Sequence, residues 1–268
     1  MTFTLGPTAV EAGYDLAAYD AIGSTNDEAL TRARSGATGP LWVVTSHQTG
    51  GRGRRGRTWQ GPRGNLAASL LIRIPQPVYV SATLGFVAGL SLSDALAACA
   101  PQATSSNGGI ALELKWPNDM IAGGAKFVGI LLESETASDG HTAIVVGIGV
   151  NVASAPEGMP YPATCLGDLG WTITAESVFE ALSDAWVKRF AQWDEGRGMA
   201  TIRDAWLSRA AGVGGPVSVA LGNRDIRGVF ESIDADGRLI VRTADGNRVP
   251  VAAGDVHFGA AATLPAAG

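Results

Sequence analysis

The sequence predicts an α/β protein with a mixed sheet, followed by a small all-β module near the C-terminus. Segments typical of strands and helices alternate over most of the chain, and short alternating segments with turn residues follow Gly212–Pro216. The 268 residues suffice for one large and one small domain. We therefore expect a first domain over residues 1–212 and a second over residues 213–268.

The first elements follow a strand, helix, strand pattern. Residues Tyr14–Tyr19 alternate in the manner of a short strand. Ser24 is a typical N-cap and predicts a helix that runs to about Ser35 and ends at Gly36. Leu41–Thr45 is a compact apolar segment and predicts the next strand.

A long segment rich in glycine and arginine separates this strand from the following one. It covers Gly50–Gly64, and the apolar strand Leu66–Ile74 comes after it. We predict a loop here, and a loop of this length in a compact domain is commonly functional. Val78–Ala100 then predicts a helix that ends before Pro101.

The middle of the chain predicts further strands of the mixed sheet. A Gly-Gly turn at Gly123 and Gly124 is expected to join the first two of them. The three expected strands are Leu112–Trp116, Phe127–Leu132 and Thr142–Val152.

Two helices and the β-rich module complete the chain. Apolar residues recur at helical spacing over Ala175–Trp193, and a second helix contains Ile202 and Trp206. We expect the tryptophans of these helices in the core. From about Gly259 the chain is a tail of small residues. The module itself predicts four short strands, at Val217–Leu221, Ile226–Ile233, Leu239–Thr243 and Arg248–Val251.

Composition and charge exclude several classes of protein. The 20 basic and 25 acidic residues give a net charge of −5, which disfavours a general coat for nucleic acid or acidic membranes. Hydrophobic residues make up 46% and charged residues 17%, which excludes extended disorder. The three histidines are scattered and offer little for a metal site or a catalytic triad.

We expect neither a targeting signal nor a membrane span. No lysine or arginine precedes Arg32, so the cationic start of a signal peptide is missing. The longest apolar stretch, near Ala143–Ala153, is too short to cross a bilayer. Cys99 and Cys165 are far apart and in no metal-binding spacing, and we interpret them as free buried thiols of a cytoplasmic protein.

The densest chemical signal is the segment Gly51–Trp59, which reads Gly-Arg-Gly-Arg-Arg-Gly-Arg-Thr-Trp and places four of the 20 basic residues within six positions. Glycine lets the backbone approach an oxyanion, and arginine supplies forked donors that match carboxylate and phosphate. The segment predicts a clamp for the phosphates of a nucleotide. A solvated loop or an RNA-binding Arg/Gly segment remains the alternative.

A second cluster begins with Lys-Trp-Pro-Asn-Asp at Lys115–Asp119 and continues with Lys126 and Gly-Ile-Leu-Leu-Glu, which ends at Glu133. Both lysines lie at expected strand ends, where an ammonium can reach a phosphate. Asn118 and Asp119 are expected in a turn with their side chains directed outward. An ordinary turn and an ordinary hairpin lysine explain the same residues without a ligand.

Two weaker motifs complete the set. Ser24-Thr25-Asn26 opens a helix, where backbone N–H groups and hydroxyls can hold a small polar group. Gly147 and Gly149 lie in a strand that ends at Asn151, and strand glycines let a ligand approach. An N-cap and two strand glycines account for these residues equally well.

Together and in this order, the four motifs resemble those of the biotin protein ligases, also called biotin–[acetyl-CoA-carboxylase] ligases. The resemblance runs from about Tyr14 to Phe258. It implies a class II synthetase-like catalytic domain with a mixed sheet and a small C-terminal SH3-like β-barrel. It also implies a monofunctional enzyme, because the sequence lacks the winged-helix DNA-binding domain that some members carry before the ligase region.

The resemblance implies a reaction in two steps. Biotin and ATP give biotinyl-5′-AMP and pyrophosphate, with Mg²⁺ on the phosphates, and the acyl group then passes to a lysine of a biotin carboxyl carrier domain of acetyl-CoA carboxylase. Arg54 and Lys126 are the expected catalytic residues of the first step, and Asp119 that of the second. No specific DNA and no membrane are expected as partners, and a homodimer stays open.

The same resemblance divides the other site residues between the two ligands. Those expected to bind biotin, besides Arg54 and Lys126, are Ser24, Thr25, Asn26, Gln48, Arg52, Gly53 and Gly147. Those expected to bind ATP or the adenylate are Arg55, Arg57, Trp59, Lys115, Asn118 and Asn151.

Two other functions compete with this one. A lipoate–protein ligase has a related fold and the same adenylate chemistry, but the arginine segment and Lys-Trp-Pro-Asn-Asp argue against it. A nucleic-acid-binding regulator that uses the arginine segment and the β-module is disfavoured by the net charge of −5.

Overall fold

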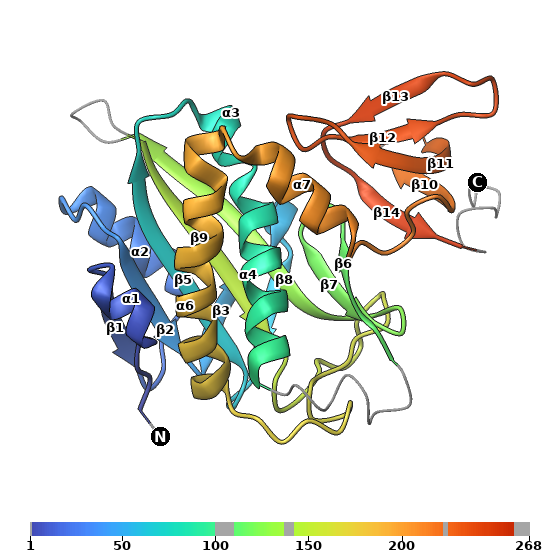
Figure 1. Ribbon diagram of the computed structural model, residues 1–268. Coiled ribbons are helices and arrows are strands. Elements are labelled where there is room, and N and C mark those ends of the chain that lie inside the picture. Colours follow the sequence, from blue (N-terminus) through green and yellow to red (C-terminus); the bar gives the residue numbers. More distant parts are fainter. Residues whose placement is uncertain (1, 100–109, 137–141, 222–224, 260–268) are drawn as a thin grey trace.

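A seven-stranded mixed sheet forms the centre of the structure (Figure 1). The computed structural model describes residues 2–99, 110–136, 142–221 and 225–259. The first two strands in the sheet order pair in parallel and the remaining neighbours pair antiparallel, which confirms the expected mixed sheet. In spatial order the strands are β1 (Asp15–Tyr19), β2 (Leu41–Thr45), β5 (Leu66–Ile74), β9 (Thr142–Val150), β8 (Ala125–Thr136), β7 (Asp119–Ala122) and β6 (Leu112–Lys115).

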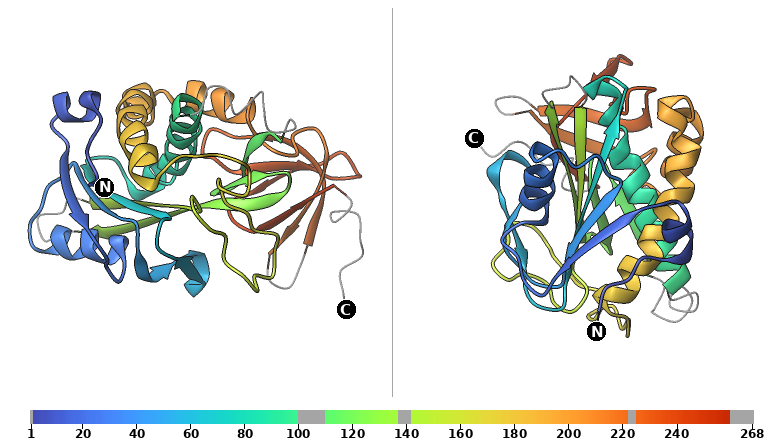
Figure 2. Two further views of the ribbon diagram at one scale, coloured as in Figure 1. Left: turned by 90° about the horizontal axis from the view of Figure 1, so that it is seen from below. Right: turned by 90° about the vertical axis from the view of Figure 1, so that its left-hand side faces the viewer.

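Helices cover both faces of this sheet (Figure 2). On one face lie α4 (Leu84–Cys99) and α6 (Ala175–Trp193), with α7 (Met199–Leu207) beside them and the short α1 (Pro7–Glu11) against α6. The opposite face carries α2 (Thr25–Arg34), which ends at Ser35 as expected. Burial of apolar side chains on both faces is the main stabilising contribution to such a layered fold.

The tryptophans of the C-terminal helices lie in the core, as expected. Trp186 and Trp193 of α6 and Trp206 of α7 are almost completely buried. Trp42 of β2 meets Trp186 edge to face, with ring centroids 6.2 Å apart. These large rings join α6 to the sheet, so the helix spacing recognised in the sequence marks the buried face.

A separate five-stranded antiparallel sheet follows α7. It confirms the expected SH3-like module, but with one strand more than the sequence indicated. The missed strand is β14, whose Asp255 and His257 alternate with only two apolar residues. The division between residues 212 and 213 stays a prediction. In spatial order the strands are β13 (Arg248–Val251), β12 (Leu239–Arg242), β11 (Asp225–Ile233), β10 (Pro216–Ala220) and β14 (Asp255–Phe258).

The helix expected over Val78–Ala100 is interrupted. A short α3 (Val78–Ser81) is separated from α4 by two residues. At the break, the Thr83 hydroxyl donates to the Val80 carbonyl at 2.6 Å and accepts from the indole N–H of Trp193 at 2.7 Å. Ala100 lies outside the described residues, as does the tail beyond Gly259.

The expected arrangement around Asp119 was wrong in one respect. Asp119 does not sit in a turn but opens strand β7, which runs antiparallel to both β6 and β8. The Gly123-Gly124 turn therefore joins β7 to β8, not β6 to β8. Only three apolar residues follow Asp119 before that turn, which is too short a run for an alternation pattern to reveal.

The expectation of a plain loop for the glycine- and arginine-rich segment was wrong. Strands β3 (Gln48–Arg52) and β4 (Thr58–Gly61) pair antiparallel, and a single 3-10 turn, Arg54–Gly56, connects them. Arginine and glycine have low strand propensity, so the sequence carries no sign of the hairpin. Arg52 ends the first strand of the hairpin, Arg54 and Arg55 lie in its 3-10 turn, and Arg57 follows that turn directly.

Two expectations about apolar segments and thiols need correction. The segment Tyr79–Cys99 is 21 residues long with a mean hydropathy of 1.5, enough by length and composition to cross a membrane. In the structure 67% of an 18-residue stretch of this segment is buried inside the protein, as in a core helix. Cys165 is a buried free thiol as expected, whereas Cys99 is only partly buried.

Candidate active site

A cavity of about 680 Å³ opens where the hairpin β3–β4, the start of α2 and strands β7, β8 and β9 meet strand β14 of the C-terminal module. It brings together nearly all residues that the sequence assigned to ligands. Those that line it are Ser24, Thr25, Asn26, Gln48, Arg52, Gly53, Arg54, Arg55, Arg57, Trp59, Lys115, Asn118, Asp119, Lys126 and Gly147.

Asn151 is the exception, because it does not line this cavity; its expected contact with the adenylate stays a prediction. It is buried and borders, together with Tyr161 and Trp59, a separate void of about 10 Å³. Its amide nitrogen donates to the Thr164 carbonyl at 3.1 Å. Among the described residues its Oδ1 has no hydrogen-bond partner. The sequence indicated that Asn151 follows the end of a strand, but not which cavity it borders.

One end of the cavity is neutral and rich in hydrogen-bonding groups. The Gln48 amide oxygen accepts from the Thr25 backbone N–H at 2.8 Å and from its hydroxyl at 3.1 Å. Ser69 of β5, which sequence reasoning missed, donates to the Thr25 hydroxyl at 2.7 Å or to Asn26 Oδ1 at 2.5 Å. A side chain at Gly147 would overlap Asn26, so this glycine makes room for the amide. Such a fixed, buried set suits a ligand with its own N–H and C=O groups.

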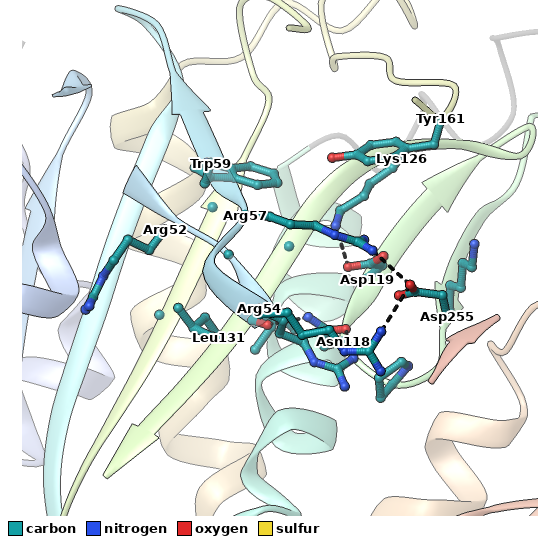
Figure 3. A pocket seen from close by; sticks show the side chains of 18 of the residues that line it. Arg52, Arg54, Arg57, Trp59, Asn118, Asp119, Lys126, Leu131, Tyr161 and Asp255 are labelled. Carbon is teal, nitrogen blue, oxygen red and sulfur yellow. Dashed lines mark hydrogen bonds and ion pairs between the residues drawn. The ribbon is translucent and has the colours of Figure 1, made fainter. Parts of the chain in front are cut away.

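Arg52 is paired within the protein instead of being directed along the cavity. Its guanidinium lies 2.6 Å from Asp27 and 2.9 Å from Glu133. The same Glu133 oxygen accepts from the Asn26 amide at 2.7 Å. Figure 3 shows the Arg52 side chain turned away from Arg54 and Lys126. Arg52 therefore holds the neutral end of the cavity through Glu133.

The centre of the cavity holds one ammonium. Lys126 Nζ lies 2.7 Å from Asp119 Oδ1, and both side chains are about one-fifth exposed. It also lies 5.6 Å from the centre of the Trp59 ring and 5.5 Å from that of Tyr161, within the range of cation–π attraction. Tyr161, which the sequence did not reveal, faces Lys126 because β8 bridges to Ala163. Burial, followed by the Asp119 charge, raises the pKa of Tyr161.

The Trp59 indole lies against a platform of two glycines. Gly129 of β8 and Gly149 of β9 are directly paired across the sheet. A Cβ at either position would come too close to the indole, at 2.9 Å and 2.5 Å. The sequence marked Gly149 as a place of close approach, and the structure shows that the approaching group is Trp59 itself.

Arg54 and Asn118 form the next part of the wall. The Arg54 guanidinium donates to Asn118 Oδ1 at 3.0 Å, and the Asn118 amide nitrogen donates to the Ile130 carbonyl at 2.6 Å. The second bond fixes the orientation of the amide, so its oxygen faces Arg54. Burial, together with the nearby Arg55 charge, lowers the pKa of Arg54, which stays a cation.

Two further arginines meet a carboxylate of the C-terminal module. Arg55 Nη1 and Arg57 Nη2 lie 3.2 Å and 2.8 Å from the same oxygen, Oδ2 of Asp255. Figure 3 shows the contact between Arg57 and Asp255. Burial alone would raise the pKa of Asp255, but the bond from Arg57 and the charges of Arg57, Arg55 and Arg54 outweigh it and lower that pKa. Sequence reasoning missed Asp255, because nothing near it in the chain indicates its partners.

The Lys-Trp-Pro-Asn-Asp segment also touches the C-terminal module. The buried Trp116 indole donates to the Gly237 carbonyl at 2.9 Å. Lys115 Nζ lies 5.9 Å from the centre of the Phe258 ring, and burial lowers the pKa of Lys115. The module thus forms one wall of the cavity and is fixed to the motif beside it.

The cavity combines neutral hydrogen-bonding groups with several cations, Lys126, Arg54, Arg55 and Arg57. No group of three or more acidic, histidine or cysteine side chains suited to a metal occurs in the part of the chain that the structure describes. The arrangement suits an enzyme that brings the carboxylate of an otherwise neutral molecule against the phosphates of a nucleotide.

Comparison with known proteins identifies the family. Residues 20–151 match the Biotin/lipoate A/B protein ligase family, and residues 213–259 match the Biotin protein ligase C terminal domain. A biotin–[acetyl-CoA-carboxylase] ligase of Paracoccus denitrificans is 42% identical over 88% of this chain and 97% of its own length. A second ligase with the same name, from Mycobacterium tuberculosis, is 35% identical over 87% of this chain and 85% of its own length. The chain belongs to the biotin protein ligases.

The fold agrees with solved structures of this family. A biotin protein ligase of Aquifex aeolicus in complex with biotin and ATP superposes with a TM-score of 0.71, at 24% identity, over 91% of this chain and 99% of that one. The biotin protein ligase of Leishmania major in complex with biotinyl-5-AMP gives a TM-score of 0.60, at 24% identity, over 89% of this chain and 99% of that one. At this level of identity the likeness concerns the fold.

Proposed function

We propose that this chain activates biotin with ATP to form biotinyl-5′-AMP and transfers the acyl group to a lysine of a biotin carboxyl carrier domain. The observation that carries the proposal is the combination of groups that line one cavity: the amide and hydroxyl groups of Thr25, Asn26 and Gln48, and the cations Lys126, Arg54, Arg55 and Arg57. The ligase relatives support the same reaction, and the acetyl-CoA carboxylase in their names is the carrier protein that we propose.

In this proposal the neutral end holds the ureido ring of biotin. The ring presents N–H donors and a C=O acceptor, and Ser24, Thr25, Asn26 and Gln48 supply matching groups at Gly147. The carboxylate of biotin then extends past Gly53 toward Lys126 and Arg54. Arg52 frames this end from outside through its bond to Glu133.

The adenylate part occupies the remaining length. Trp59, Asn118 and Lys115 line the region that we assign to the adenosine, and Arg55 and Arg57 the region of the outer phosphates. Asn151 contributes only if a ligand reaches the small void that it borders together with Tyr161.

The first step needs charge compensation more than a general base. A carboxylic acid with a pKa like that of glutamate, about 4.3, is already ionised at neutral pH. One carboxylate oxygen attacks the α-phosphorus, the bond to the bridging oxygen breaks, and pyrophosphate leaves. Lys126 and Arg54 lie where two anions must approach each other, so they stabilise the charge that grows on the phosphoryl oxygens.

Mg²⁺ enters this proposal with ATP. Bound to the phosphates, it would neutralise part of their charge. Asp119 and Asp255 are the carboxylates that line the cavity, and each is already paired with a cation. Mg²⁺ commonly takes most of its ligands from phosphate and water, so one of these carboxylates suffices beside them.

Three remaining expectations are part of the proposal. We propose a cytoplasmic enzyme, in keeping with its two free thiols.

We propose that it binds no specific DNA, because a net charge of −5 with one basic hairpin offers few phosphate contacts. Footprinting at physiological salt tests this, and a protected sequence would contradict it. The oligomeric state, including a homodimer, is to be measured by light scattering.

The decisive experiment is incubation with ATP, Mg²⁺ and a biotin carboxyl carrier domain, read by a streptavidin blot. We expect a labelled carrier that is absent without ATP, and its absence with ATP would sink the proposal. ATP–pyrophosphate exchange with biotin and with lipoate separates the two ligases of related fold. Exchange with lipoate alone would identify a lipoate ligase.

A further inference from the structure

Asp255 of the C-terminal module reaches the arginine hairpin from 200 residues further along the chain. One of its oxygens accepts from both Arg55 and Arg57, at 3.2 Å and 2.8 Å. All three side chains are between 40% and 59% exposed, so a dissolved anion can reach them. The two arginines are those that we assign to the outer phosphates of ATP.

A purely structural role as a link between the two sheets does not explain this contact well. The module is already fixed by the buried bond from the Trp116 indole to the Gly237 carbonyl. The segment just before the module, Arg209–Ala211, is also held by backbone bonds in both directions to Leu114 of the first domain. An exposed ion pair adds little to such attachments. Asp255 is therefore the replaceable contact of this interface.

The two guanidinium groups that hold the Asp255 carboxylate are also suited to a phosphate oxygen. Arginine forks accept carboxylate and phosphate in the same geometry. Arg55 is held in the left-handed region, with φ 57°, and its guanidinium still reaches the same oxygen as Arg57. Without an anion between them, the two guanidinium groups would repel each other.

We propose, on the basis of the proposed function, that Asp255 is a positioning residue that holds Arg55 and Arg57 in their phosphate-binding arrangement and gives them up to the polyphosphate of ATP. It acts through the arginines and takes no part in bond formation. After the first step it recaptures them, which favours the departure of pyrophosphate.

The sign of its effect on affinity follows from the charges. Pyrophosphate carries more negative charge than one carboxylate, so it displaces Asp255 from Arg55 and Arg57. The Asp255 carboxylate then remains nearby and repels the bound pyrophosphate. The repulsion acts on every charge of the pyrophosphate, whereas the order that Asp255 gives to two exposed arginines is a small gain. Asp255 therefore lowers the affinity for free polyphosphate.

The test measures binding of inorganic pyrophosphate without Mg²⁺ by isothermal titration calorimetry. For Asp255→Asn we expect Kd to fall roughly three- to tenfold at low ionic strength, with a smaller fall at high salt. Asp255→Glu keeps the charge and should stay close to the unaltered protein. The matched control is Asp225→Asn in the same module, whose carboxylate lies 3.4 Å from Arg227 of its own strand. Its Kd should not change.

A second measurement separates positioning from simple charge removal. Without ligand, trypsin should cleave the hairpin at Arg55 or Arg57 faster in Asp255→Asn than in Asp225→Asn, because the arginines lose their partner. An unchanged or higher Kd for pyrophosphate, or equal cleavage of the two variants, would overturn the proposal. Neither readout requires ligase activity, so a failed streptavidin blot would count against the proposed function alone.

Discussion

The ammonium nitrogen of Lys126 lies 2.7 Å from Oδ1 of Asp119, and the pair sits at the centre of the cavity between two neighbouring strands. A bulge between Met120 and Ile121 shifts the register of β7 against β8. Lys126 therefore already forms an ion pair with Asp119 before any substrate binds. An incoming carboxylate or phosphate competes with Asp119 for the same ammonium, which links the two residues in both steps of the proposed reaction.

Loss of either central cation should slow adenylate formation. We expect Lys126→Ala and Arg54→Ala each to reduce the rate of ATP–pyrophosphate exchange about a hundredfold or more, or ~3 kcal/mol of barrier, since each charge acts on the phosphoryl centre. Melting temperatures should change little, because neither side chain is part of the core. Lys188→Ala on α6 is the control for loss of a cation elsewhere. Unchanged exchange in Lys126→Ala would show that its role is misassigned.

The glycine platform under Trp59 gives a second prediction. Gly149→Ala places a methyl group against the indole, so the ring must move and we expect KM for ATP to rise about tenfold. The crowding should also cost roughly 1–3 kcal/mol of stability, measurable by chemical denaturation. In Gly85→Ala the added carbon meets a neighbour at an ordinary 3.7 Å, which makes it the control. An unaltered KM for ATP would argue that Trp59 does not contact the nucleotide.

The arginine hairpin should be protected by ligands. We expect trypsin to cleave within Gly50–Gly64 more slowly when biotin and ATP are both present, because bound anions neutralise the clustered charges. We expect a moderate effect, because Asp27, Glu133 and Asp255 already form ion pairs with three of the arginines in the unliganded protein. Equal cleavage with and without ligands would contradict the prediction. Cleavage in the presence of biotin alone and ATP alone shows which ligand provides the protection.

The sequence predicted those parts of the site that are contiguous in the chain. Arg54, Asn118 and Lys126 stand in dense motifs, and their chemistry is readable from residue types and order. Ser69 and Asp255 are not predictable in this way, because an isolated serine or aspartate acquires its role only from a partner brought close by the fold.

The fold shows the same limit. Strands with several buried apolar residues, such as Leu66–Ile74, were predicted with the correct bounds. The hairpin β3–β4 and strand β14 were not, since their pairing is fixed by neighbours and not by their own apolar pattern. The sequence could indicate that Asn151 follows a glycine-bearing strand, but not that it borders a separate small void with Trp59 and Tyr161.

The last prediction concerns the transfer step. The ε-amine of the acceptor lysine, with an unperturbed pKa of about 10.4, must lose a proton before it attacks the adenylate. Asp119 is the carboxylate beside Lys126 at the centre of the cavity, and we expect it to orient this amine and help its deprotonation. Asp119→Asn should therefore still form biotinyl-5′-AMP without a carrier, since Lys126 keeps its charge. Transfer in single-turnover assays should slow about a hundredfold, and the defect should ease as pH rises, because more of the amine is then already neutral. If Asp119 only holds Lys126 and the end of β7 in place, both steps should slow alike and the melting temperature should fall. A normal single-turnover transfer rate would remove Asp119 from the mechanism.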